Sequence, residues 1–284
     1  MSGEPSLDDA DLIGPGLIAA VILGLVEGLT EFLPVSSTGH LVVANRLLGH
    51  DDPTFLVAIQ AGAISAIAVL YRKRLLHAAA GILRSGGGIG SNLLTLIVVA
   101  ALPATVLGLL FDDFLDAHLF RPGVVAGTTI AGGVLLLLLE RWLRRTPQAT
   151  RRDSTQMTPR DAVFVGALQC LALVPGTSRS AATIAGGLLA GLSRTAAAEF
   201  SFLVGLPILY GACLLKLWKE RDRLGGEYLA DLSIGAAASF FTAIVVVVPF
   251  VRFLQKHTFA PFAWYRIAAG LALAWMCAAG VFDR

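Results

Sequence analysis

Long hydrophobic runs separated by short polar breaks make up most of this chain of 284 residues. Six of the runs are close to the length of about 20 residues that an α-helix needs to cross a bilayer. They cover 55–71, 92–110, 123–139, 200–218, 232–251 and 262–281. Because such runs recur along the whole chain, the pattern predicts an all-α, polytopic integral membrane protein with six transmembrane helices.

Two further hydrophobic segments, 14–48 and 161–192, are interrupted near their middle by a proline and several hydroxyl residues. The breaks begin at Pro34 and Pro175, and the second arm of each segment is too short to cross a membrane alone. Irregular backbone at membrane depth is tolerated where it lines a cavity or is covered by protein. Each segment is therefore predicted to form a re-entrant hairpin of two half-helices.

The two predicted hairpins divide the chain into similar halves. Residues 1–146 contain the hairpin 14–48 and three spans, and residues 161–284 contain the hairpin 161–192 and three spans. A polar, basic linker, 147–160, lies between them. An odd number of crossings in each half reverses the second half relative to the first. The prediction is one membrane domain built as an inverted-topology repeat, whose hairpin tips meet near the midplane.

A short shared pattern supports this division. Both hairpins contain glycine, then glutamate or glutamine, then proline followed by hydroxyl residues. The members are Gly24, Glu27, Pro34, Ser36 and Ser37 in the first hairpin, and Gly166, Gln169, Pro175, Thr177 and Ser178 in the second. The distance from the glutamate or glutamine to the proline differs by one residue, so the alignment is imperfect.

Composition and charge limit the classes of function that the chain can have. The chain is 56% hydrophobic with a mean hydropathy of +0.74, and its net charge of +2 gives no footprint for nucleic acid. Its three cysteines lie in apolar runs and are expected to be small buried hydrophobes: Cys170, Cys213 and Cys277. Basic residues within 72–84 and 141–160 predict a cytoplasmic location for both stretches, and acidic residues within 112–116 predict an external loop.

Glu27 and Glu31 are the first candidates for chemistry. They are four residues apart, so both project from one helical face. Two such carboxylates repel each other unless a cation lies between or beside them, and hard divalent cations such as Mg²⁺ or Ca²⁺ prefer oxygen ligands. The alternative is a pair of charges at a helix end that reaches water.

The second tip carries Thr177, Ser178, Arg179 and Ser180 at the start of a half-helix. Free amides and the partial positive charge at a helix N-terminus suit a phosphate group. The planar guanidinium of Arg179 matches phosphate oxygens in addition. The alternative is that Arg179 is only an anchor at the membrane interface.

The first tip adds Ser36, Ser37, Thr38 and His40 to the carboxylates. An imidazole can exchange a proton near neutral pH, although His40 could also be a satisfied structural residue. Carboxylates, an arginine, hydroxyls and a histidine together suit hydrolysis of a phosphoryl bond. Because the tips lie within the membrane, the substrate is expected to have a lipid tail.

These residues resemble the undecaprenyl-diphosphatase family of the bacitracin-resistance type. The stretch from Glu27 through Glu31 to Pro34-Val-Ser-Ser-Thr-Gly-His40 is similar to its first signature, and Pro175-Gly-Thr-Ser-Arg-Ser180 to its second. The resemblance covers the whole chain. It implies hydrolysis of undecaprenyl diphosphate, which regenerates the lipid carrier for peptidoglycan, with a divalent cation and in a homodimer. It also implies a bacterial inner membrane location with the site open to the periplasm.

The resemblance implies roles for the tip residues. Glu27 and Glu31 would bind metal or organise the nucleophile, and Arg179 with Ser178 would hold the diphosphate. Supporting substrate contacts are implied or expected at Ser36, Thr38, Thr177 and Ser180. The nucleophile stays open: Ser37 with His40 as its base is preferred, and attack by His40 itself is equally compatible. A lipid-carrier transporter or flippase is the alternative from another class, and a structural membrane protein is a third.

Overall fold

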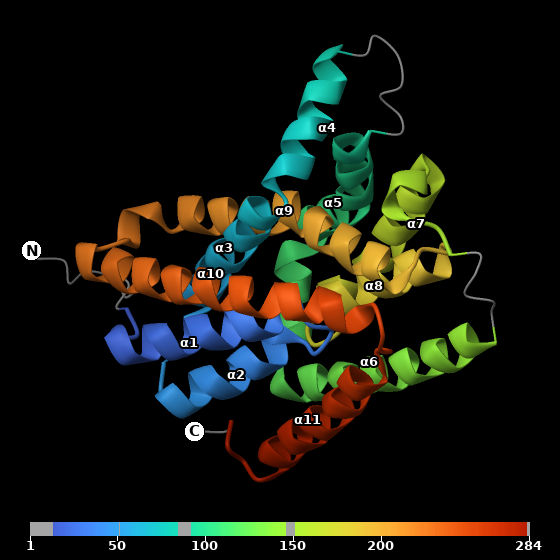
Figure 1. Cartoon of the computed structure of the whole chain (residues 1–284). Coiled ribbons are helices and arrows are strands. Elements are labelled where there is room, and N and C mark those ends of the chain that lie inside the picture. The colour runs from blue at the N-terminus through green and yellow to red at the C-terminus, as the bar shows by residue number, and fades with distance from the viewer. Residues whose placement is uncertain (1–13, 51, 85–91, 146–150, 283–284) are drawn as a thin grey trace, which may run out of the picture.

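The computed structural model describes residues 14–50, 52–84, 92–145 and 151–282. This part of the chain consists of helices and one isolated β-bridge, between Arg152 and Leu192 (Figure 1). The predicted all-α architecture is therefore confirmed.

Six helices form the first half of the chain: α1 (Leu17–Thr30), α2 (Ser37–Leu48), α3 (Pro53–Leu70), α4 (Arg72–Arg84), α5 (Leu93–Leu119) and α6 (Pro122–Arg144). The second half contains α7 (Pro159–Gln169) with the 3₁₀ turn Cys170–Leu173, α8 (Arg179–Leu189), α9 (Arg194–Lys219), α10 (Gly226–Leu254) and α11 (Ala260–Ala278). Two short 3₁₀ turns, Ser154–Gln156 and Arg221–Arg223, lie before α7 and α10.

Five of the described helices are long and apolar enough to cross a membrane, as a polytopic membrane protein requires. They are α3, the Leu93–Phe111 part of α5, α6, α9 and α10. The sixth predicted span, 262–281, forms α11, which contains Arg266 and lies outside that set of five.

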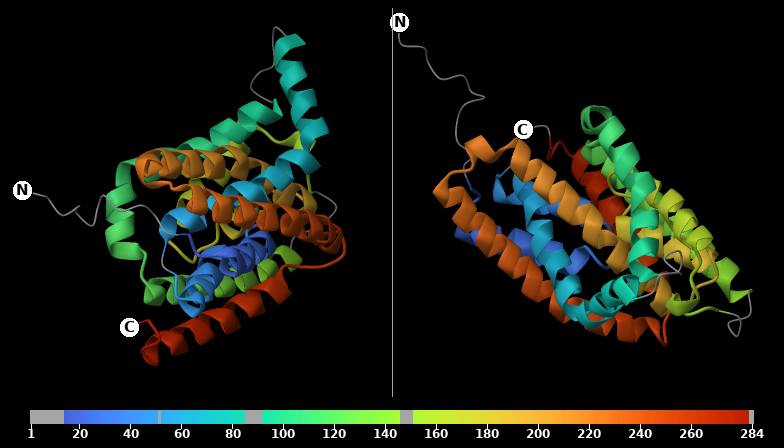
Figure 2. Two further views of the ribbon diagram at one scale, coloured as in Figure 1. Left: turned by 90° about the vertical axis from the view of Figure 1, so that its left-hand side faces the viewer. Right: turned by 90° about the horizontal axis from the view of Figure 1, so that it is seen from above.

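Two boundaries differ from the sequence analysis. Helix α5 continues to Leu119, so 112–116 is helical and not a loop. Residues 72–84, expected only as a basic cytoplasmic stretch, form α4, which projects from the bundle (Figures 1 and 2). The predicted linker, 147–160, lies partly outside the described residues, and the division of the chain at this linker stays a prediction.

Helix contacts follow the same pattern in both halves. Helix α1, the first arm of one hairpin, packs along α10, and α7, the first arm of the other, packs along α5 (Figures 1 and 2). The other large contacts join α6 to α11, α3 to α10 and α3 to α9. The first arm of each hairpin is therefore held against a long helix of the other half, and both tips reach the interior of the bundle.

Glycines permit the closest of these helix contacts, because a residue without a side chain lets two backbones approach. Gly24 and Gly28 face the α10 backbone at Gly235 and Ser239, where a Cβ atom would overlap a carbonyl oxygen. Gly166 of α7 faces the carbonyl oxygen of Ala100 in α5, 2.5 Å from the position of a Cβ atom. The first arms of the two hairpins thus lie backbone to backbone against their neighbours.

A buried carboxylate connects the ends of three helices. Glu140 of α6 accepts hydrogen bonds from Arg194 at the start of α9, at 2.7 and 3.2 Å. Its Oε1 atom also accepts the backbone N–H of Phe259, before α11, at 2.9 Å. Since a buried charge is tolerated only when it is paired and hydrogen-bonded, this cluster fixes how α6, α9 and α11 meet.

We predict that Gly24→Ala destabilises the protein. The new methyl group meets the α10 backbone and forces the two helices apart, which costs about 1–3 kcal/mol. Gly127→Ala in α6 is the matched control, because nothing lies within 4 Å of its Cβ position. Alanine also has the higher helix propensity, so the control should unfold at or above the wild-type temperature in detergent. Equal melting temperatures for the two variants would contradict this packing.

Candidate functional site

Each hairpin tip ends in a serine with an unusual backbone conformation. Ser36 precedes α2 with φ of 74°, and Ser178 precedes α8 with φ of 72°. They are the only non-glycine residues with positive φ among those described. Both side chains cap their helix, since Ser36 Oγ accepts the Gly39 N–H at 3.4 Å and Ser178 Oγ accepts the Ala181 N–H at 3.2 Å. Strained residues of this kind cluster at functional sites.

These caps change the alignment of the two hairpins. The sequence analysis paired Ser37 with Ser178 by their distance from the prolines. The structure gives Ser36 and Ser178 the same capping role, and these residues are 142 positions apart, as are Glu27 and Gln169. The two prolines are out of step by one residue because the first arms end differently, with α7 continuing into a 3₁₀ turn.

A hydrogen-bonded chain of three side chains connects the tips. The Arg179 guanidinium donates to Glu31 Oε1 at 2.8 Å, and the Ser37 hydroxyl donates to Glu31 Oε2 at 2.7 Å. The Glu31 side chain is 6% exposed and the Arg179 side chain 11% exposed. Both oxygens of this carboxylate are thus engaged, one by each hairpin.

Arg179 is held in place by the helix that follows its hairpin. Its second terminal nitrogen donates to the Ser201 carbonyl oxygen of α9 at 2.8 Å. Gly205, one turn further on, leaves room for the guanidinium, because a Cβ atom there would lie 2.8 Å from the nearer terminal nitrogen. Arg179 is thus an ion-pair partner inside the bundle, and the alternative of an anchor at the membrane interface does not fit.

Glu27 lies one turn before Glu31 and is fully buried. Neither of its carboxylate oxygens has a hydrogen-bond partner within the described residues, although the charges of Glu31 and Arg179 act on it. The alternative of a helix end reaching water does not fit a side chain with no exposed surface. A buried carboxylate without partners is costly, so its two oxygens are available for a ligand that the protein itself does not supply.

The carboxylate oxygens of this site fit a hard divalent cation that is also bound by the phosphates of a substrate. Within the described residues no group of three or more His, Cys, Asp or Glu side chains surrounds a metal position. The acidic ligands available to a cation are therefore the two carboxylates of Glu27 and Glu31. Mg²⁺ is commonly held by one or two carboxylates together with substrate phosphates, which matches this arrangement.

The remaining hydroxyls of the tips have different surroundings. Ser180 is buried, donates to the Leu33 carbonyl oxygen at 3.0 Å and lies 3.0 Å from the Ser178 hydroxyl, so it ties one tip to the other. The side chains of Thr38 and Thr177 are half-buried and make no hydrogen bond within the described residues. Their role in substrate binding stays a prediction.

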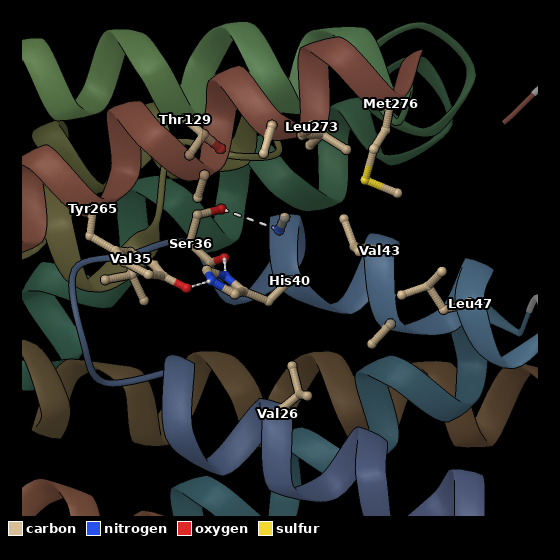
Figure 3. Close-up of a pocket in the computed structure, with 14 residues that line it drawn as sticks. Val26, Val35, Ser36, His40, Val43, Leu47, Thr129, Tyr265, Leu273 and Met276 are labelled. Atoms are coloured by element: carbon tan, nitrogen blue, oxygen red, sulfur yellow. Dashed lines mark hydrogen bonds between the residues drawn. The ribbon is translucent and has the colours of Figure 1, made fainter. Parts of the chain in front are cut away.

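His40 lies beside the carboxylate cluster but turns to other partners. Its Nδ1 atom is 2.8 Å from the Ser36 carbonyl oxygen, and its Nε2 atom is 2.6 Å from the Tyr265 hydroxyl (Figure 3). A carbonyl oxygen only accepts, so Nδ1 carries the proton, and a neutral ring accepts at Nε2. In the described structure no hydrogen bond joins His40 to Ser37.

Arg266 is the main site-supporting residue that the sequence analysis missed. It lies in the last predicted span, is fully buried and donates to four backbone carbonyl oxygens. One belongs to each tip, at Pro34 (3.5 Å) and Gly176 (3.0 Å), and two belong to α6, at Thr129 (3.2 Å) and Thr128 (3.4 Å). A charged residue in an otherwise apolar span was the available signal.

Helix α6 supports the second tip directly as well. The Thr128 hydroxyl donates to the Pro175 carbonyl oxygen at 2.5 Å. The Thr129 hydroxyl donates to the Gly176 carbonyl oxygen at 3.3 Å. Gly132 in the next turn leaves the space that the Arg266 guanidinium fills. Carbonyls freed by the broken helices are thus satisfied by α6 and α11, as buried irregular backbone requires.

Fold and site together define a class: polytopic α-helical membrane proteins with a buried carboxylate, arginine and serine cluster between two broken helices. Residues 20–272 match the family described as bacitracin resistance protein BacA. The chain belongs to this family.

Curated relatives extend over nearly the whole chain. Undecaprenyl-diphosphatase of Albidiferax ferrireducens is 47% identical over 266 residues, which are 91% of this chain and 95% of the relative. Undecaprenyl-diphosphatase 2 of Rhodospirillum rubrum is 48% identical over 271 residues, with the same two coverages. Undecaprenyl-diphosphatase 1 of Chromobacterium violaceum is 47% identical over 259 residues, or 90% of this chain and 94% of the relative.

We predict that Arg266→Gln destabilises the protein and loosens the tips. The shorter amide reaches fewer of the four carbonyl oxygens, and each hydrogen bond lost from a charged donor costs about 1.5–3 kcal/mol. The control is Arg252→Gln, an exposed arginine in the last turn of α10. Thermal unfolding in detergent should separate the variants by several degrees. Identical unfolding curves would show that Arg266 does not hold the tips.

Proposed function

We propose that this chain hydrolyses undecaprenyl diphosphate to undecaprenyl phosphate and inorganic phosphate. The reaction recycles the lipid carrier for cell-wall synthesis and so confers bacitracin resistance. Membership of the family and the names of its relatives support this. The structural observation that carries the proposal is the chain of hydrogen bonds from Ser37 through Glu31 to Arg179, which places a hydroxyl, a carboxylate and a guanidinium at one buried point.

Arg179 is the proposed anchor for the diphosphate. Its guanidinium is already turned towards the carboxylates, and its Nε atom has no hydrogen-bond partner within the described residues. A guanidinium matches phosphate oxygens in a two-pronged geometry. The Ser178 cap and the N-terminus of α8 lie next to it and add backbone amides that favour an anion.

The charge of the site argues for a cation. Two carboxylates against one arginine leave a net negative charge where an anionic diphosphate must bind. Glu27, with two unpartnered oxygens, and Glu31 would hold a divalent cation, either Mg²⁺ or Ca²⁺. When bound, it would neutralise charge that develops on the phosphoryl oxygens.

Ser37 is the proposed nucleophile, with Glu31 rather than His40 next to it. Its Oγ atom attacks the terminal phosphorus while its proton passes to the Glu31 carboxylate. The bond from that phosphorus to the bridging oxygen breaks and releases undecaprenyl phosphate. Water then attacks the phosphorus of the phosphoserine, and the bond from Ser37 Oγ to phosphorus breaks. Glu31 returns its proton to Oγ, and the protons of the water leave with inorganic phosphate. The 2.7 Å hydrogen bond from Ser37 to Glu31 supports Glu31 as the acceptor of the Ser37 proton. Both ring nitrogens of His40 are hydrogen-bonded to other residues.

Location and assembly are part of the same proposal. The chain is a multi-pass membrane protein by its apolar helices. We place it in the bacterial inner membrane, with the site open to the periplasm and the basic α4 on the cytoplasmic side, because basic loops favour the cytoplasm. We also propose a homodimer, as the family resemblance implies.

Replacing residues of the hydrogen-bonded chain tests the site. We predict that Glu31→Gln, Arg179→Ala and Ser37→Ala each lower phosphate release from undecaprenyl diphosphate by about 100-fold or more, because each removes a group aimed at the transferred phosphoryl. Glu199→Gln is the matched control, since Glu199 pairs with Arg74 at 2.9 Å in a partly exposed bridge outside the site. Normal turnover by any of the three site variants, with the control also normal, would contradict its assigned role.

Removing metal tests the carboxylate pair separately. We predict that a chelator abolishes phosphate release by the purified protein and that added Mg²⁺ or Ca²⁺ restores it. Glu27→Gln should raise the metal concentration needed for half-maximal activity about tenfold or more, because it takes one charged ligand from the site. Full activity in the presence of chelator would show that the reaction does not need a divalent cation.

A further inference from the structure

Three neighbouring arginines lie near the C-terminal end of α6, and two of them have a carboxylate partner. Arg152 is paired with Asp161 at 2.9 Å, and Arg194 is paired with Glu140 at 2.7 Å. Arg151 has no such partner in the described part of the chain. Its Nε and Nη1 atoms are buried and have no hydrogen-bond acceptor there. The proposed reaction gives this arginine no role.

The path of the backbone explains why Arg151 reaches the end of α6. Arg152 forms a short bridge with the loop before α9, because its N–H donates to the Gly191 carbonyl oxygen and its carbonyl oxygen accepts the Ser193 N–H, both at 2.9 Å. Neighbouring side chains of an extended segment point to opposite sides. Arg152 therefore turns to α7, and Arg151 turns to α6, where its Nη2 atom donates to the Leu143 carbonyl oxygen at 3.3 Å.

The only carboxylate that acts on Arg151 is already in use. Glu140 Oε1 accepts from Arg194 Nε and from the Phe259 N–H, and its Oε2 accepts from Arg194 Nη2. Burial and the positive charge of Arg194 lower the pKa of Arg151, and Glu140 acts in the opposite direction. Two guanidinium groups thus share one carboxylate. Since buried charged donors without acceptors are costly, the group that this cluster lacks is an oxyanion.

We propose that Arg151, with Arg194 beside it, binds the phosphate group of an anionic phospholipid at the end of α6. The site is separate from the proposed reaction and does not depend on it. A planar guanidinium matches phosphate oxygens, and hydrogen bonds between two charged groups are the strong ones. The Arg151 side chain as a whole is only partly buried, so a head group can approach it from the surface.

The outer face of α6 places this cluster at the membrane surface. Leu135, Leu138 and Trp142 lie on one face of the helix and are 62%, 53% and 48% exposed. An apolar stripe that ends in tryptophan is typical of a helix at the boundary between acyl chains and water. Leu143 follows Trp142 and accepts the hydrogen bond from Arg151, so the guanidinium lies at the depth of phospholipid heads. Free phosphate is the other source of the same chemistry.

Lipid binding by two arginine variants tests the proposal. Native mass spectrometry of the purified full chain would compare phosphatidylglycerol, which is anionic, with phosphatidylcholine, which has no net charge. We expect Arg151→Gln to weaken the binding of phosphatidylglycerol about tenfold or more, because it removes a charged donor from the phosphate. Arg160→Gln removes the same charge at an exposed position in the first turn of α7 and should bind as the wild type does.

Two results would overturn the proposal: equal weakening by the two variants, or wild-type protein that binds phosphatidylcholine as tightly as phosphatidylglycerol. Both variants should release phosphate from undecaprenyl diphosphate as the wild type does, which also shows that they fold. Loss of the reaction in the wild type would count against the proposed function and not against this site.

Photochemical labelling of the wild-type protein does not depend on a variant folding. A phosphatidylglycerol with a photoreactive group in its head should label residues 139–145 or 151–156, and unmodified phosphatidylglycerol should compete. Competition by inorganic phosphate at a similar concentration would support the phosphate site and overturn the lipid as its source. Labelling confined to other segments would overturn the site itself.

Discussion

The buried ion pair between Glu31 and Arg179 is the interaction on which the rest of this structure depends. Either charge alone would be expensive in an apolar interior, and together they are tolerated because each is also hydrogen-bonded. The two residues are 148 positions apart and belong to different hairpins. The pair therefore requires that two broken helices from distant parts of the chain end at the same place. Ser37 joins it from the start of α2.

The bundle around the pair is built to satisfy what broken helices leave open. Arg266 donates to a carbonyl oxygen of each tip, and α6 supplies two hydroxyls to the second tip. Gly132 and Gly205 make room for the two buried guanidinium groups. Glu27 is the exception in this otherwise satisfied interior, because both of its oxygens lack partners in the described structure. A buried carboxylate without partners, next to one that is ion-paired, is the feature of this fold that indicates a binding or catalytic site.

The sequence predicted the helices and the tips because the signals are strong: apolar runs of membrane length, each tip marked by proline and hydroxyl residues. It predicted Glu31 and Arg179 because charges inside apolar segments are costly. It did not predict the role of Arg266, although its charge inside an apolar span was a signal of the same kind, because its partners are backbone carbonyls far away in the sequence. Nor could residue types reveal the positive φ of Ser36 and Ser178, which follows from the tertiary path of the chain.

A double-mutant cycle on Glu31 and Arg179 tests the central claim most directly. The thermal unfolding of Glu31→Gln, Arg179→Gln and the double variant would be compared with that of the wild type in the same detergent. If the ion pair joins the hairpins, the double variant loses much less stability than the two single variants together, with a coupling energy of about 1–3 kcal/mol. Losses that simply add would show that the two residues do not meet, and the account of the site would fail with them.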